Sequence, residues 1–263
     1  MSTRYEFYGD AANLSDVEKQ KLSELYAKIL GTFRKIAVHK NDDPHFEIKK
    51  EVLEEELIEL IKNNPNILFT IQHYIPENRM FGTESMKTLY SEFLDYGFTK
   101  MAEFCLTNPK FRNTMVPSFG DKQYPITGIV FLGRKERSKI LHKFLEIDSN
   151  LYTQVDESGQ NLGMYCAGPN CQDLEDIVLK FLDHDEAAIA QDKEGRTIGM
   201  HCATWSIKSG VIKASRHPQA KELCDKHGKN IFDYAEERKI EIPDLTEEEI
   251  KKMYKQNLKK SLR

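Results

Sequence analysis

Apolar residues recur at helical spacing in two long stretches near the start of the chain. Residues 14–40 carry such a set after Ser15, a residue type that favours helix N-termini: Leu22, Leu25, Ile29 and Phe33. Residues 44–65 carry a second set and end at Pro65, which cannot continue a helix: Val52, Leu53, Leu57, Ile58 and Ile61. The pattern predicts two amphipathic helices, and neither contains a recognisable catalytic constellation.

From about residue 80 onward the pattern becomes periodic. The stretch "DESGQNLGMYCA" at 156–167 returns 36 residues later as "DKEGRTIGMHCA" at 192–203. Extending the alignment in both directions gives five equivalent positions, spaced by 36, 37, 36 and 33 residues: Met86, Lys122, Gly159, Gly195 and Gly228. Because repeats of about 20 to 50 residues are typical of solenoids, the spacing predicts a stack of similar units.

The residue types within each copy predict a turn followed by a short helix. Glycine stands where a tight turn needs a positive φ. Two residues later come residue types that favour a helix N-cap: Thr88, Asn161, Thr197 and Asn230. Pro125 occupies a first helical position, where its missing N–H costs nothing. The pairs Cys166-Ala167 and Cys202-Ala203 supply small side chains, which we expect to let neighbouring helices pack closely.

The periodic part resembles the ankyrin repeat. The best complete match is "YPITGIVFLGRKERSKILHKFLE" at 124–146, and "GKNIFDYAEER" at 228–238 is similar to the form common in a last repeat. The resemblance spans about residues 80–240. It implies an all-α fold, a helical solenoid of about five repeats over residues 80–242. We expect a helical cap region at 1–79 and an amphipathic basic helix at 243–263, opened by a capping box of Thr246 and Glu249.

The histidine and cysteine in "GMHCA" raise the question of a metal or catalytic cluster. Paired ligands at the short spacing of zinc sites are absent around His201, Cys202, Cys166, Cys171 and His184. No cysteine-hydrolase context surrounds Cys202 or Cys224. We therefore expect buried framework residues, with no catalytic residue, metal or cofactor. The alternative is an enzyme with an unrecognised active site in the N-terminal helical region or in the groove of the stack.

The composition limits the classes of binding partner and the cellular compartment that we expect for this protein. The net charge of −4 does not favour nucleic-acid binding, and five cysteines without a pairing pattern favour a reducing compartment. No cleavable signal peptide and no membrane-spanning run is visible. The basic residues of the last segment allow contact with an acidic membrane surface, although a solvated capping helix is favoured: Lys251, Lys252, Lys255, Lys259, Lys260 and Arg263. An intracellular, cytoplasmic monomer is expected.

Ankyrin domains mostly bind proteins through the concave groove and the turn tips, and the resemblance implies the same use here. Carried onto this chain, the groove candidates are Tyr96, Phe131, Leu132, Thr204 and Trp205. The turn-tip candidates are Lys193, Glu194 and Arg196. The composition also resembles that of ankyrin-repeat effectors that intracellular bacteria deliver into host cells. That resemblance implies a protein secreted without a cleavable signal peptide, whose partner the sequence does not identify.

Overall fold

The computed structural model describes residues 2–37, 45–75, 85–118, 121–132 and 134–244, and these residues are mostly helical, as the sequence predicted. The chain divides into two compact units, Met1–Cys166 and Ala167–Arg263. Almost all of the predicted C-terminal helix at 243–263, including Thr246 and Glu249, lies outside the described residues. The predicted boundaries at residues 79 and 242 stay predictions.

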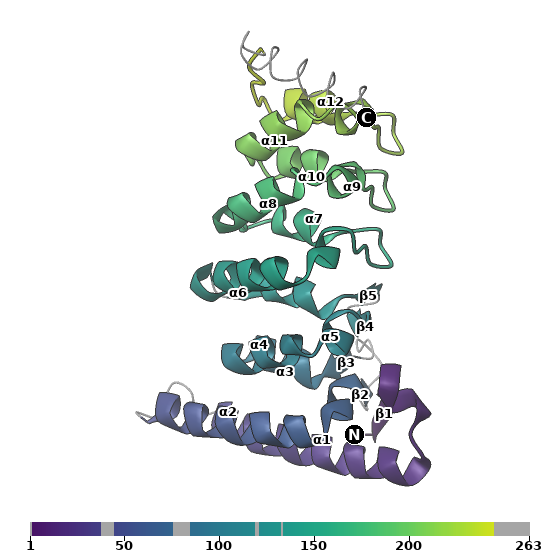
Figure 1. Cartoon of the computed structure of the whole chain (residues 1–263), viewed down its shortest axis with the longest axis vertical. Helices are drawn as coiled ribbons and strands as arrows, with labels where there is room; N and C mark the ends of the chain where they lie inside the picture. The colour runs from purple at the N-terminus through teal and green to yellow at the C-terminus, as the bar shows by residue number, and fades with distance from the viewer. Residues whose placement is uncertain (1, 38–44, 76–84, 119–120, 133, 245–263) are drawn as a thin grey trace. The chain divides into compact units, whose positions relative to one another are not determined.

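The two predicted N-terminal helices are confirmed as α1 (Asp16–Ala37) and α2 (Phe46–Asn63), which lie side by side in Figure 1. Ser15 caps α1 through a reciprocal pair of hydrogen bonds. Its backbone N donates to Glu18 Oε2 at 2.9 Å, and Glu18 N donates back to Ser15 Oγ at 3.4 Å. The apolar stripes bury Ile29, Leu57 and Ile61, but Val52, predicted as part of the second stripe, is 52% exposed.

The all-α prediction omits two small antiparallel sheets in the first unit. One has the order β1-β2-β3, from Ser2–Phe7, Thr70–Ile75 and Ser85–Thr88. The other pairs β4 (Val116–Ser118) with β5 (Asp121–Gln123). Residues 70–75 combine β-branched and aromatic types that favour strands, and the expectation of a helical cap region at 1–79 overlooked that signal.

Apart from α6, which has 14 residues, the remaining helices of the first unit are short. In chain order, they are η1 (Gly9–Asn13), η2 (Pro65–Phe69), α3 (Leu89–Asp95), α4 (Thr99–Thr107), α5 (Pro109–Arg112), η3 (Pro125–Phe131), α6 (Arg134–Ile147), η4 (Ser149–Tyr152) and α7 (Leu162–Cys166). Their core includes a buried ion pair in which Arg112 Nη2 lies 2.7 Å from Asp148 Oδ2. Burial opposes ionisation of Asp148, but hydrogen bonds from Arg112 and Asn113 outweigh it and lower the pKa of the carboxyl.

The second unit contains η5 (Gln172–Leu174), α8 (Glu175–Phe181), α9 (Asp185–Ile189), α10 (Ile198–Thr204), α11 (Lys208–Ser215), η6 (Ala220–Glu222) and α12 (Ile231–Glu237). Two glycines stand where these helices contact one another. A Cβ added at Gly199 would lie 2.5 Å from Ala214 Cβ and from Ile231 Cδ1, and one at Gly210 would lie 2.5 Å from Cys202 Sγ. The helix-interior glycines are therefore required by packing, which offsets their conformational cost.

Candidate interaction surface

An aspartate organises each of the three turns that precede α7, α10 and α12. Asp192 shows the arrangement: its Oδ1 accepts backbone N–H bonds from Glu194 and Arg196, both at 2.9 Å. Asp156 and Asp225 accept the equivalent pair of bonds in their own turns. The turn glycines follow three residues later with positive φ, at 76° for Gly159, 80° for Gly195 and 78° for Gly228. The predicted tight turns are therefore confirmed.

The second carboxylate oxygen of each aspartate bonds to a side chain nine residues further on. Asp192 Oδ2 lies 3.0 Å from His201 Nε2, and because an ionised carboxylate only accepts, that nitrogen carries the proton. The equivalent bonds come from Tyr165 Oη to Asp156 at 2.6 Å and from Tyr234 Oη to Asp225 at 2.8 Å. His201 therefore has the same structural role as the two tyrosines, and it ties the turn to the following helix.

Arg196 completes the Asp192 network. Its Nε and Nη2 lie 2.9 Å and 2.8 Å from Asp192 Oδ2. Burial alone would raise the pKa of Asp192, but the hydrogen bonds from His201 and Arg196 outweigh burial and hold that pKa well below its ordinary range. Arg196 was predicted as a turn-tip binding residue, and the structure gives it a framework bond as well. The sequence carried a signal for this network, since the aligned copies share Asp156, Asp192 and Asp225.

The predicted N-caps divide into those that cap through their side chains and one that does not. Thr88 accepts from Ser91 N at 3.0 Å, Asn161 from Met164 N at 3.0 Å, and Asn230 from Phe232 N at 2.8 Å. Thr197 occupies the N-cap position of α10, yet its side chain makes no capping hydrogen bond and its hydroxyl is buried without a partner. For Thr197 the predicted side-chain cap is therefore wrong.

The cysteines of the repeated stretches are buried framework residues. Cys166 and Cys202 have no solvent exposure, and burial raises the pKa of the Cys202 thiol far above its ordinary value. Within the described ranges, no group of three or more histidine, cysteine, aspartate or glutamate side chains is placed to hold a metal ion. The Met200-His201-Cys202 cluster thus belongs to the packing of α10.

Three of the predicted groove residues lie in the first unit. Tyr96 is half-buried, and Phe131 is 75% exposed. Leu132 is only 8% exposed, so its assignment to an open surface is wrong. Leu132 follows η3 in extended backbone, at φ −69° and ψ 169°, so its side chain leaves the backbone in a different direction from that of the helical Phe131 and is buried.

The other predicted residues lie in the second unit, at the two ends of α10. Lys193 and Glu194 are exposed in the turn before the helix, where Glu194 O accepts from Lys226 N at 2.9 Å. Thr204 is half-buried, and its hydroxyl donates to Met200 O at 2.9 Å. Trp205 ends the helix with 42% of its surface exposed. These residues and the first three belong to different units.

The backbone that carries Trp205 is fixed by a recurring helix end. Ser206 has φ 61°, and Ile207 N donates back to Cys202 O at 2.9 Å. The last turn of α12 repeats this geometry: Lys239 has φ 54°, and Ile240 N donates to Ala235 O at 2.8 Å. Trp205 directly precedes the left-handed Ser206, so its side chain extends from an ordered part of the backbone.

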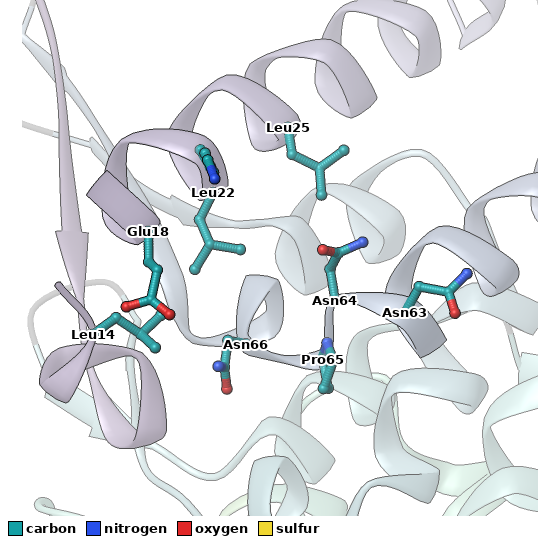
Figure 2. A pocket seen from close by; sticks show the side chains of 9 residues that line it. Leu14, Glu18, Leu22, Leu25, Asn63, Asn64, Pro65 and Asn66 are labelled. Atoms are coloured by element: carbon teal, nitrogen blue, oxygen red, sulfur yellow. The ribbon is translucent and has the colours of Figure 1, made fainter. Parts of the chain in front are cut away.

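A pocket of about 240 Å³ opens beside α1 and the end of α2, and Figure 2 shows its lining. Carboxylate and amide groups from Glu18 and Asn64 face it together with the apolar side chains of Leu22 and Leu25. Glu18 is bonded to Ser15, and Asn64 Nδ2 donates to Leu60 O at 3.0 Å. These two polar groups serve helix ends, and the pocket does not present them as a catalytic pair.

Comparisons with known protein families and with curated proteins found no match for this chain. Among the described residues, no helix combines the length and apolar character needed to cross a membrane.

Proposed function

We propose that the protein is a non-enzymatic module that binds another protein, and that residues 80–242 form an ankyrin-type solenoid. Recurring local geometry supports the solenoid. Left-handed residues directly follow the C-caps of α3, α10 and α12 at Gly97, Ser206 and Lys239. A fourth, Asn170, lies four residues after the end of α7, and the intervals from 170 to 206 and from 206 to 239 are 36 and 33 residues. The turn glycines at 159, 195 and 228 have the same intervals. The sequence periodicity thus has a counterpart in backbone conformation.

The exposed indole of Trp205 is the observation that carries the binding proposal. The polar groups of this turn are used within the turn and helix, because His201 and Arg196 both bond to Asp192. Trp205 lies on an ordered helix end, so little conformational entropy would be lost when a partner covers it. Exposed tryptophan is also typical of binding hot spots. Phe131 has the corresponding role on the first unit.

We further propose that the protein is a monomer and that it acts inside a cell. The resemblance to bacterial effectors makes a host cell the location that we propose to test first.

Two pairs of variants test the binding proposal. We expect Trp205→Ala and Phe131→Ala each to reduce capture of partner protein from a cell lysate by about tenfold or more, as for hot-spot residues. The matched controls are Phe232→Ala, at 44% exposure in the second unit, and Ile147→Ala, at 61% in the first. The controls should capture partner normally, and all four variants should keep the melting temperature of the original protein.

Loss of folding in the Trp205→Ala and Phe131→Ala proteins would show that both rings are core residues. The binding proposal would then lose its support. Equal loss of capture in the control variants would point to general surface hydrophobicity and would also count against a specific surface.

A further inference from the structure

Unpaired cations gather on the edge of the second unit that carries Trp205. Several cations of this unit pair with carboxylates: Arg196 with Asp192, Lys213 with Asp183, Lys226 with Glu194, and Lys229 with Glu237. Within the described residues, the side chains of Lys208, Arg238 and Lys239 form no hydrogen bond or ion pair. All three are exposed, and all follow the ends of α10 or α12.

The starts of α10 and α12 are neighbours, and because the two helices have the same length we infer that their ends are neighbours too. At their starts, a Cβ added to Gly195 would lie 3.0 Å from Asp225 Cα, and one added to Gly199 would touch Ile231. Both helices contain seven residues and end with the same hydrogen bonds. Arg238 therefore occupies in α12 the position of Trp205 in α10, at about the 8–10 Å that separates packed helices.

The surroundings of Trp205 thus combine a flat apolar ring with cationic groups that lack partners. Cations near a helix C-terminus also interact favourably with the negative end of the helix dipole, and this effect stabilises Arg238 and Lys239 at the end of α12. That effect needs no indole beside them, and it does not explain why Lys208 at the start of α11 is cationic too. Glu236 and Glu241 are exposed acids near Arg238 and Lys239, and the exposed Glu175 accepts a hydrogen bond from Ser209 beside Lys208. The charge of this edge is therefore mixed, but the side chains of its three cations have no partner among the described residues.

We propose that this edge, formed by Trp205, Lys208, Arg238 and Lys239, binds an acidic peptide segment that carries an apolar side chain. The apolar side chain packs on the indole, and the flanking carboxylates face the guanidinium and ammonium groups. This inference rests on the proposed protein-binding function and names the chemistry of its partner.

The chain offers a direct readout, because Trp205 is its only tryptophan. The probes are two synthetic peptides without aromatic residues: a run of glutamates around one central leucine, and the same peptide with lysine in place of glutamate. We expect the glutamate peptide to shift Trp205 emission to shorter wavelength, with saturation, and to bind more weakly as salt screens the charges. The lysine peptide should leave the emission unchanged.

Charge variants distinguish this inference from general stickiness. The double change Arg238→Glu with Lys239→Glu should weaken binding of the glutamate peptide by about tenfold or more, since two favourable charge contacts become repulsive. Glu241→Lys should strengthen it, and Lys221→Glu, where the native cation already pairs with Glu222, should change it little.

Two results would overturn the inference: no emission change with the glutamate peptide at millimolar concentration, or equal binding of the lysine peptide. If either occurs while Trp205→Ala still abolishes partner capture, the protein-binding function stands and only the acidic partner is wrong. If Trp205→Ala leaves capture intact, the proposed function fails as well.

Discussion

At the scale of single residues, the aspartates of the turns hold each turn and its following helix together through several hydrogen bonds. Asp192 receives two backbone N–H groups through one oxygen and two side chains through the other. A carboxylate with this many donors is stabilised in its charged form, although it is buried. The hydrogen bond that His201 donates to Asp192 therefore accounts for the histidine in "GMHCA" without a catalytic role.

Replacement of His201 by phenylalanine tests this role. The variant keeps a ring of similar size but removes the donor to Asp192 Oδ2, so we expect a loss of about 1–2 kcal/mol in the free energy of unfolding. Urea denaturation measures it. His227→Phe is the control, because His227 is exposed and bonds to Asp225 through its backbone N. Equal stability of the His201→Phe protein would contradict the proposed bond.

The lowered pKa values of Asp192, Asp148 and Asp225 predict acid sensitivity. A carboxyl whose pKa is lower in the folded chain than in the unfolded chain binds fewer protons when folded. Its contribution is therefore present above about pH 4 and is lost as the pH falls further. Urea midpoints measured from pH 6 to pH 3 should fall, and Asp192→Asn should show a shallower decline. An equally steep decline in that variant would refute the assignment to Asp192.

At the scale of elements, glycine and small side chains set how closely the helices of the second unit approach. The Gly210 backbone lies against Cys202, and Gly199 lies against both Ala214 and Ile231. Alanine would favour each helix by propensity, yet the contacts leave no room for a methyl group. Packing between elements therefore outweighs local helix preference at these positions.

A pair of glycine-to-alanine changes separates packing from propensity. Gly210→Ala should destabilise the protein by about 1–3 kcal/mol, because the new methyl group overlaps the Cys202 sulfur. Gly31→Ala in α1 meets nothing within 4 Å and should stabilise it by about 0.5–1 kcal/mol. Thermal unfolding of the two proteins gives both signs. If Gly210→Ala stabilised the protein instead, α10 and α11 would be able to move apart with little loss of free energy.

Sequence periodicity predicted the helices well and the strands poorly. Amphipathic spacing is strong over the long α1 and α2, whereas β2 has six residues and its pairing with β1 is set by residues some 70 positions away. The turns at Gly159, Gly195 and Gly228 were predictable, because a tight turn needs a positive φ and glycine is the residue that adopts it most readily. The bond from His201 to Asp192 and the burial of Leu132 depend on side-chain directions, which composition and spacing do not determine.

At the scale of the whole molecule, the described polar networks serve the framework, and large apolar side chains remain on the surface of each unit. Phe131 is exposed on the first unit and Trp205 on the second. Phe131 is the last residue of η3, which begins at Pro125, and Trp205 follows α10, which the turn of Asp192 precedes. These exposed rings, each on an ordered backbone, are the feature on which the proposed binding function rests.

Site-specific photocrosslinking tests that function most directly. A photoreactive phenylalanine analogue is placed at Trp205 in one protein and at Phe232 in another, and both are irradiated in cells that produce them. The account predicts a discrete crosslinked protein from position 205 that is absent from position 232. No crosslinked protein from position 205, or the same products from both positions, would contradict it.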